Sequence, residues 1–357
     1  MTVYDLSLPE LTERLAAWEE PAFRAKQVYA QLWRRAARYE EMSDVSPALR
    51  ERLASELPTL VEVLDERTAD RGGTRKALLK LGGRGHEIET VIMGYRDRVT
   101  VCVSSQAGCA MGCGFCATGQ MGLTSNLSAG EIAAQVVWAR REAPRLPGST
   151  PQRLSNVVFM GMGEPMANYR AVDGAVSRMT DPDSMGIGAR HVTVSTVGLV
   201  PGIHRLGVDR PLVGLAVSLH AADDELRDEL VPPNRLYPLA ALEEAISDWR
   251  QRTRRRPSIE WAMIDGVNDS DEQAGRLAPI AFRLHAHVNL IPLNPTPGWP
   301  SEPSPRRRIE GFVRVLEAGG VNVTVRDTRG RGIDAACGQL RLEHGPAMHA
   351  APASAPG

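Results

Sequence analysis

Strand-like and helix-like stretches alternate along most of the chain from residue 99 onward. Short apolar runs rich in β-branched residues predict strands, and longer stretches with apolar residues at helical spacing predict helices between most of them. The predicted strands are 99–103, 157–161, 192–197, 213–219, 259–264, 288–293 and 321–326, and the predicted helices are about 129–141, 169–179, 238–252, 271–284 and 305–318. Repeated units of this kind predict an α/β fold with a parallel sheet covered by helices.

The number of units decides between a complete and an incomplete barrel. A complete barrel has eight strand–helix units, whereas six or seven can be recognised here. The pattern therefore predicts a partial (β/α)6-type parallel barrel over 99–343. A doubly wound open sheet is the alternative that the pattern leaves open.

Two smaller parts precede the barrel, and a tail follows it. Residues 1–60 carry apolar positions at helical spacing and predict an N-terminal helical accessory domain with its own core. Residues 61–98 predict a linker with a β-hairpin, whose strands are 76–81 and 87–93. The Ala/Pro-rich tail, 344–357, has the composition of a disordered segment.

Composition restricts the class of protein. With 357 residues, 43% of them hydrophobic, the chain can bury one large core and a small accessory domain. The formal net charge of −1 provides no overall positive field for nucleic acid. Arginines gather locally, and each cluster alone is best interpreted as solvated surface, but several together leave an RNA-binding surface open. The clusters are Arg34, Arg35 and Arg38; Arg252, Arg254, Arg255 and Arg256; Arg306, Arg307 and Arg308; and Arg326, Arg329 and Arg331.

Cysteine usage and the N-terminus indicate the compartment. The five cysteines do not form the pattern of a secreted disulfide framework, because four lie close together and one is distant. The chain begins without a basic region followed by an apolar one, as a signal peptide would have. No apolar run approaches the ~20 residues of a membrane helix. These features predict a cytoplasmic protein with no membrane segment.

Three cysteines, Cys109, Cys113 and Cys116, have the spacing C-x3-C-x2-C in the loop that follows the first barrel strand. Such spacing lets several thiolates converge on one metal centre. Iron–sulfur cubanes usually take four cysteines, so a three-cysteine site leaves one iron open to another ligand. Zinc is the main alternative, but no fourth Cys or His follows at finger-like spacing. The loop therefore predicts an iron–sulfur site with an open position.

Candidate ligand-binding residues recur where the predicted barrel strands end, and these ends meet at one rim. Strand 157–161 runs into Gly161–Met162–Gly163–Glu164–Pro165, where glycine permits close approach of a ligand and Glu164 can pair with an ammonium group. A plain turn is the alternative for this segment alone. Small polar groups or accessible backbone at other strand ends come from Ser195, from Ser218, Leu219 and His220, and from Asn294.

Each of these strand ends has an ordinary explanation as well. Serine or asparagine at a strand end commonly caps the next helix, and His220 could be a hydrogen-bonded structural histidine. Four such endings around one rim favour a shared pocket.

Two further thiols lie outside the cluster motif. Cys102 is part of an apolar strand, where a single cysteine usually packs. Cys337 has Gly and Ala neighbours that predict an exposed loop, where a thiol is more often reactive than structural.

These segments, in order, resemble a known family. The three-cysteine motif is similar to that of the radical S-adenosylmethionine (radical SAM) superfamily, and the GMGEP segment resembles the element that holds the amino group of the cofactor in those enzymes. The complete set resembles the RlmN/Cfr family of radical SAM adenosine methyltransferases that act on ribosomal RNA. The matching segments are His86–Val91, Cys102–Gly122, Asn126–Ile132, Val158–Tyr169, Val192–Pro201, Ala216–Pro232, Val288–Gly298 and Ala336–Leu340.

The resemblance implies a two-stage reaction with two S-adenosylmethionine molecules per turnover. One methylates Cys337, and a second, bound at a [4Fe-4S] cluster on Cys109, Cys113 and Cys116, is the source of a radical that activates the new methyl group. The resulting carbon bonds to carbon 2 of an adenine. The resemblance makes Glu89 the base that removes the proton and Cys102 the thiol that releases the product. The hairpin that carries Glu89 would then fold over the barrel mouth.

The resemblance also implies partners and leaves alternatives. The substrate would be 23S rRNA, with transfer RNA as a second substrate in some family members, and the electron donor would be a flavodoxin or ferredoxin. The N-terminal helical domain is an expected RNA contact, and a monomer is the default state. A carbon-8 methyltransferase of the Cfr type is the alternative within the family. A zinc-binding RNA adaptor without catalysis is a remote alternative from another class.

Overall fold

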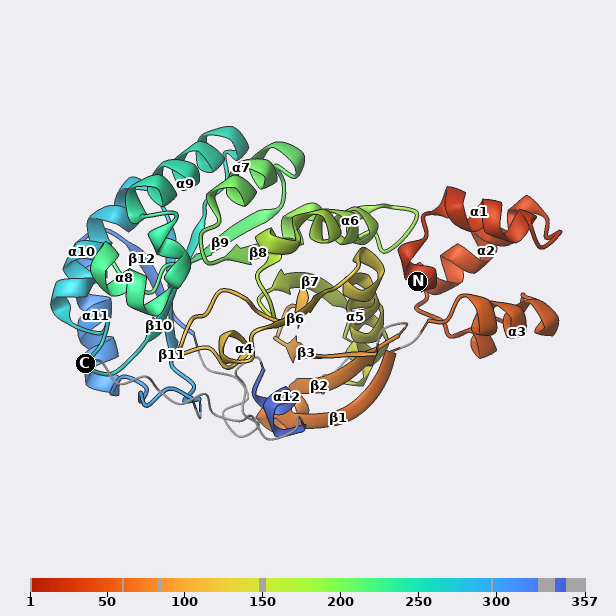
Figure 1. Ribbon diagram of the computed structural model, residues 1–357, viewed down its shortest axis with the longest axis horizontal. Helices are drawn as coiled ribbons and strands as arrows, with labels where there is room; N and C mark the ends of the chain where they lie inside the picture. Colours follow the sequence, from red (N-terminus) through yellow and green to blue (C-terminus); the bar gives the residue numbers. More distant parts are fainter. Residues whose placement is uncertain are drawn as a thin grey trace.

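The computed structural model of the chain describes residues 2–59, 61–82, 85–147, 152–296, 298–326 and 338–344. Its parts follow one another along the long axis, from three N-terminal helices at one end to the parallel part of a large sheet at the other (Figure 1). The expected disordered tail, 344–357, lies outside the described residues apart from residue 344.

The N-terminal helices form a small unit with its own core. They are α1 (Leu8–Ala16), α2 (Ala22–Trp33) and α3 (Pro47–Glu56). A capping box of Ser7 and Glu10 begins α1 and pairs backbone N–H groups that the first turn leaves without a partner. The buried Trp33 packs edge-on against Tyr4, with ring centroids 5.3 Å apart. Phe23 of α2 is 60% exposed and is not part of this core.

One ten-stranded sheet runs through the rest of the molecule, in the order β1-β2-β3-β4-β7-β8-β9-β10-β11-β12. From β4 onward, neighbouring strands are parallel. These strands are β4 (Val99–Cys102), β7 (Leu154–Phe159), β8 (Val192–Thr196), β9 (Gly214–Ser218), β10 (Ser258–Met263), β11 (His287–Pro292) and β12 (Asn322–Val325). Within the described residues the sheet has two free edges, β1 and β12, so the predicted partial barrel is confirmed.

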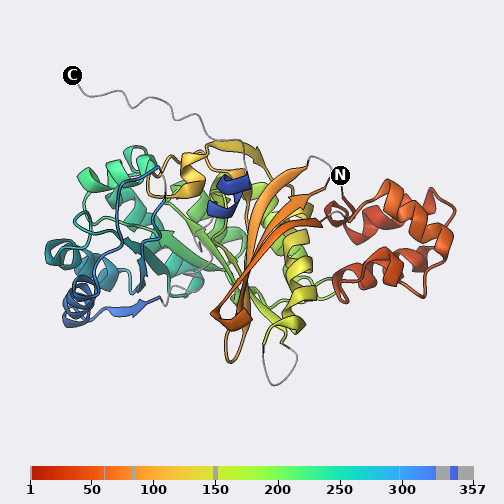
Figure 2. The same ribbon diagram turned by 90° about the horizontal axis from the view of Figure 1, so that it is seen from below.

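Helices alternate with the parallel strands and follow the outer side of the curved sheet (Figures 1 and 2). They are α5 (Ala129–Glu142), α6 (Tyr169–Thr180), α7 (Val200–Asp209), α9 (Leu239–Thr253), α10 (Asp271–Arg283) and α11 (Arg306–Ala318). The short helix α8 (Asp224–Leu230) follows β9 and packs against the cysteine loop. Strand residues such as Val157, Val194 and Leu215 are almost completely buried. This arrangement explains why the parallel strands are continuous apolar runs in the sequence.

The antiparallel part of the sheet extends the barrel at one edge. It consists of β1 (Val61–Ala69), β2 (Thr74–Leu81) and β3 (His86–Gly94). β3 pairs with β4, and Val91 lies opposite Cys102. The hairpin is therefore hydrogen-bonded into the sheet and does not fold over the barrel mouth as we expected. The sequence also did not predict β1, because four of its nine residues are charged and five are exposed.

Short elements carry the cysteine loop and the end of the described chain. β5 (Gln106–Gly108) and β6 (Leu123–Asn126) form a separate two-stranded sheet. Between them lie the cysteine loop and α4 (Ala117–Gln120). The last helix, α12 (Gln339–His344), lies against β3 and α4 (Figure 2). Two segments far apart in the sequence thus meet beside the cysteine loop.

Candidate active site

The cysteine loop begins at a turn that requires glycine. Gly108 has a left-handed φ of 77°, and a Cβ there would lie 2.0 Å from the carbonyl oxygen of Gly122. The next residue, Cys109, donates its backbone N–H to the same carbonyl at 2.8 Å. The ends of β5 and β6 therefore approach closely enough to close the loop at its base.

The three thiols of the loop lie in a largely buried environment. Cys109 and Cys113 are buried and Cys116 is partly buried. Burial first, and then the neighbouring Cys116, raises the pKa of Cys109 to about 12. Burial also raises the pKa of Cys113, and the other two thiols and Glu164 add to that rise. Each thiol is thus close enough to influence the others electrostatically, and the thiolate forms require a compensating positive charge.

The three thiols have the chemistry of ligands to an iron–sulfur cluster. A cubane spreads its thiolate ligands over several irons. Three buried thiols whose ionised forms need positive charge are suitable ligands for such a cluster.

One aromatic side chain, Trp299, packs on the loop. A Cβ at Gly114 would lie 2.1 Å from the Trp299 ring, so that ring packs directly on the backbone. Gln120 donates through Nε2 to the Gly114 carbonyl at 2.6 Å and to Thr296 Oγ1 at 2.7 Å. The segment after β11 therefore packs on the cysteine loop and is hydrogen-bonded to it.

The GMGEP turn places Glu164 beside the cysteine loop. Gly163 has a φ of 97°, and a Cβ there would lie 2.5 Å from Gln106 Cβ. The Glu164 carboxylate is buried and accepts the N–H groups of Met166 and Val197, each at 2.9 Å. Burial raises the pKa of Glu164 to about 7, although both hydrogen bonds act in the opposite direction. An ammonium group at this carboxylate would compensate its buried charge.

The other rim residues of the sequence prediction lie at or just after the carboxyl ends of strands. Ser195 is buried in β8, Ser218 ends β9, and Leu219 is buried immediately after it. Asn294 is partly buried beyond the end of β11. The backbone therefore brings all of them to one edge of the sheet, as the parallel topology predicts.

His220 has the environment of a structural histidine. It has a left-handed φ of 61°, and its Nδ1 accepts the Ala262 N–H at 3.0 Å. Its ring packs edge-on against Phe115, with centroids 4.9 Å apart. Burial lowers the pKa of His220 to about 3, so the ring is neutral at physiological pH. The ring supports the rim and the cysteine loop, while its backbone lies at the strand end.

Arg227 is a rim residue that the sequence prediction did not include. Its guanidinium is buried and donates to the carbonyls of Val197 at 2.6 Å and Leu219 at 3.0 Å. It therefore joins the ends of β8 and β9. Burial lowers the pKa of Arg227 to about 10, whereas the nearby Cys113 raises it. In the sequence it is one charged residue among many in a polar helix, and no local signal distinguishes it.

Glu89 lies at the centre of a buried ion pair. Its Oε2 is 2.9 Å from Lys76 Nζ, and both side chains are fully buried. The same carboxylate accepts the backbone N–H groups of Gly338 and Arg341, each at 2.8 Å. The sequence prediction did not include Lys76, because a lysine in an amphipathic strand is expected to face solvent. The Glu89 side chain thus binds the backbone at the beginning of α12.

Gly338 connects Glu89 with the cysteine loop. A Cβ on Gly338 would lie 2.6 Å from Thr118 Oγ1, and Thr118 follows Cys116 by two residues. Cys337 itself lies outside the described residues. The residue that follows it in the chain therefore lies between Glu89 and the cysteine loop.

Cys102 belongs to the same network through its neighbours. It is buried at the end of β4, opposite Val91 of β3. Two residues later, Ser104 Oγ donates to the Glu89 carbonyl at 2.6 Å and accepts the Met162 N–H at 2.9 Å. Glu89, Cys102 and the GMGEP turn are thus held by one set of buried contacts.

A parallel partial barrel with a three-thiol loop at the carboxyl edge of its strands defines the radical SAM class. In agreement, residues 103–278 match the family model of the radical SAM superfamily. Residues 1–58 match the model of the ribosomal RNA large subunit methyltransferase N-terminal domain. No described helix has the length and apolar character that crossing a membrane would require.

Similarity to known proteins identifies the family within this superfamily. A Salinispora tropica protein named "Probable dual-specificity RNA methyltransferase RlmN" is 53% identical over 92% of this chain and 89% of its own length. A protein of the same name from Chloroflexus aurantiacus is 50% identical over 96% and 93%. The crystal structure of a radical SAM methyltransferase from Sphaerobacter thermophilus is 49% identical, with a TM-score of 0.90 over 95% of this chain and 98% of that one. The chain therefore belongs to the RlmN family of radical SAM RNA methyltransferases.

Membership implies a [4Fe-4S] cluster, S-adenosylmethionine and an RNA substrate. The buried thiols and the carboxylate of Glu164 have the chemistry that such cofactors need, as described above. The family name by itself does not specify which atom of the RNA receives the methyl group.

Proposed function

We propose that this chain methylates carbon 2 of an adenosine in 23S rRNA, with transfer RNA as a second substrate. The observation that carries the proposal is the contact between Glu89 and Gly338. It supports a base and a methyl-carrying cysteine at neighbouring positions, beside the thiols of the cluster loop. Carbon 2 of adenine has no lone pair and no acidic proton, so methylation there requires a radical route.

The cofactors supply the radical chemistry, and the chain supplies the positions. We propose that Cys109, Cys113 and Cys116 hold the [4Fe-4S] cluster and that Glu164 and Gly163 bind the amino group of S-adenosylmethionine. Ser195, Ser218, Leu219, His220 and Asn294 would form the remaining cofactor rim. When bound, the cluster and S-adenosylmethionine supply a deoxyadenosyl radical that can remove one hydrogen atom from a methyl group.

The steps that the side chains of the protein carry out would begin and end at cysteine sulfur atoms. The Cys337 thiolate attacks the methyl carbon of a first S-adenosylmethionine, displaces S-adenosylhomocysteine and becomes a methyl thioether. After hydrogen removal, the methylene carbon on Cys337 bonds to carbon 2 of the adenine, which creates an RNA–protein thioether. Glu89 would then take the proton from carbon 2, and the adduct would return its unpaired electron to the bound cluster, which restores the aromatic ring. The Cys102 thiolate attacks the Cys337 sulfur, and the carbon–sulfur bond breaks with its electrons on the carbon side. That carbon is protonated, and a Cys102–Cys337 disulfide remains for reduction by a thiol.

The route requires two S-adenosylmethionine molecules per turnover and a one-electron donor. We propose a flavodoxin or ferredoxin as the donor, with a monomeric enzyme in the cytoplasm. The target adenine must leave its stack to reach the site. The N-terminal helices would contribute to RNA binding.

The proposal is tested by mass spectrometry of nucleosides from ribosomal and transfer RNA. A host that lacks its own enzyme is supplied with the wild-type gene, the Cys337→Ala gene or an empty vector. We expect 2-methyladenosine only with the wild-type gene. 8-Methyladenosine in its place would assign the Cfr-type activity, and no methyladenosine from a well-expressed wild-type chain would refute the proposal.

A further inference from the structure

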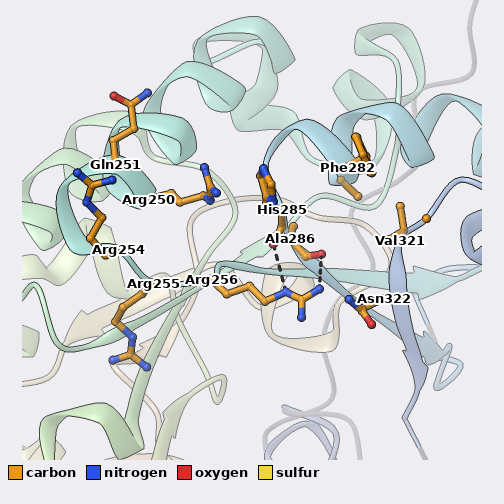
Figure 3. A pocket seen from close by; sticks show the side chains of 12 residues that line it. Arg250, Gln251, Arg254, Arg255, Arg256, Phe282, His285, Ala286, Val321 and Asn322 are labelled. Atoms are coloured by element: carbon orange, nitrogen blue, oxygen red, sulfur yellow. Dashed lines mark hydrogen bonds between the residues drawn. The ribbon is translucent and has the colours of Figure 1, made fainter.

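A second concave site lies at the opposite end of the barrel from the cysteine loop. It is a pocket of about 440 Å³ between the ends of α9 and α10 and the beginnings of β10, β11 and β12. The cysteine loop instead packs near Ala262, Ile264 and Leu293, at the other ends of these strands. Figure 3 shows the side chains that line this pocket, among them Arg250, Arg254, Arg255, Arg256, Phe282 and His285.

The positive charge of this arginine pocket is not neutralised by the protein. Within the described part of the chain, none of its four arginines forms an ion pair with a carboxylate. Arg256 donates to the carbonyls of His285 at 3.1 Å and Ala286 at 3.4 Å, as the dashed lines in Figure 3 show. Arg283 near this pocket, in contrast, lies 2.7 Å from Glu243.

Arg255 lies at the edge of the pocket, on the side of Arg190. Its Nη2 donates to the Arg190 carbonyl at 3.4 Å. Planar arginine groups bind phosphate through two parallel hydrogen bonds. The pocket therefore has the chemistry of a phosphate-binding site.

An exposed aromatic pair adjoins the arginines. Phe282 is 59% exposed and stacks on His285, with ring centroids 6.4 Å apart and an interplanar angle of 17°. An accessible aromatic face beside arginines is the usual composition of a site for unpaired nucleotides, because every base can stack on it. A protein partner with acidic side chains would need the arginines but not the exposed ring.

The position of the pocket argues against an electron donor. A donor must approach the cluster, but strand β10, with its six residues, spans about 20 Å between the two ends of the barrel. A folded RNA is large enough to contact both ends. We propose that the arginine pocket binds phosphate groups, together with an unstacked base, of the substrate RNA at a segment remote from the target adenosine. This inference rests on the RNA substrate of the proposed function.

Two of the pocket residues permit a test in which folding is preserved. Arg254 and His285 follow helices in the left-handed conformation, with φ of 57° and 50°. Glycine is the favoured residue at such helix ends. Arg254→Gly therefore removes a positive charge while the melting temperature stays equal or rises.

The experiment measures binding of a fluorescein-labelled transfer RNA transcript to the full chain over a range of salt concentrations. We expect the triple variant Arg250→Gln/Arg254→Gly/Arg255→Gln to bind about tenfold more weakly at 0.1 M salt, and the slope of log K against log salt to fall by about two. Arg283→Gln, which removes the same charge from an ion pair nearby, is the matched control and keeps the wild-type affinity. Arg254→Gly alone gives an intermediate loss.

Each other outcome overturns the inference. Equal affinities and slopes for the triple variant and the wild type would do so, as would an equal loss in Arg283→Gln. Displacement of the RNA from the wild type, but not from the triple variant, by inorganic phosphate at micromolar concentration would assign the pocket to free phosphate. If the wild-type chain methylates no RNA, the proposed function fails; if it does and the triple variant binds normally, this inference alone fails.

Discussion

Glu89 and Lys76 form a buried pair that bears on both the stability of the sheet and the placement of α12. Neither side chain has exposed surface, and the carboxylate also holds the backbone of α12. Removing one partner of such a pair leaves an uncompensated buried charge, whereas replacing both by apolar residues does not.

We therefore expect Lys76→Met to lower the free energy of unfolding by about 3–5 kcal/mol. The double variant Lys76→Met/Glu89→Leu should recover most of this loss, because no charge remains buried without a partner. Chemical denaturation of the three chains measures both effects. The double variant should fold and yet produce no methylated RNA, since the proposed base is absent. A single variant as stable as the wild type would contradict the role assigned to the pair.

Glu164 predicts a dependence of stability on pH in the chain prepared without cofactors. Its folded pKa of about 7 is above the ordinary value of 4.5. The folded state therefore holds its proton more tightly, so the contribution of this group is fully present below pH 4.5 and is lost as the pH rises to 7. The loss amounts to about 3 kcal/mol, and Glu164→Gln should not show it. Denaturation at pH 5 and pH 8 tests this, and equal pH dependence in both chains would refute it.

Residues in local sequence motifs can be predicted from the sequence, whereas charged residues that the fold buries cannot. Cys109, Cys113, Cys116 and Glu164 occur in short local motifs at strand ends, and such motifs can be recognised without a structure. Lys76 and Arg227 acquire their roles only because the fold removes them from water. Burial of a single charged side chain depends on distant segments, so the sequence gives no indication of it.

At the scale of elements, the parallel strands were predictable and the antiparallel edge was less so. Strands buried on both faces are continuous apolar runs, whereas β1 exposes charged residues at the edge of the sheet. The pairing of β3 with β4 also decides that Glu89 lies within the sheet and not in a lid. Strand pairing of this kind depends on register between distant segments, which periodicity alone does not contain.

The packing of the Trp299 ring on the cysteine loop leads to a prediction about assembly of the iron–sulfur cluster. Because a Cβ at Gly114 would lie 2.1 Å from the Trp299 ring, Gly114→Ala must displace that ring. We expect a loss of more than half of the iron bound after anaerobic reconstitution, and partial recovery in Gly114→Ala/Trp299→Ala. Gly275→Ala is the control, since a Cβ there meets no atom within 4 Å. Full iron content in Gly114→Ala would show that the ring does not restrain the loop.

At the scale of the whole molecule, the N-terminal helices are fastened to the barrel by specific contacts. Asp5 Oδ1 accepts the Gly130 N–H at 2.9 Å at the beginning of α5. Arg140 donates to the Trp33 carbonyl at 2.7 Å, and Arg141 pairs with Glu41 at 2.6 Å. These contacts join the N-terminal segment to α5 of the barrel at both ends of that helix.

We propose that methylation proceeds through a covalent RNA–protein thioether at Cys337, which Cys102 resolves. The most direct test incubates Cys102→Ser, reconstituted with its cluster, with RNA, S-adenosylmethionine and a reductant under anaerobic conditions. We expect a species that migrates as protein joined to RNA on a denaturing gel, and mass spectrometry should locate the link at Cys337. The wild type should release methylated RNA, and Cys337→Ala should form neither. Methylated RNA from Cys337→Ala, or release by Cys102→Ser without the joined species, would contradict the account.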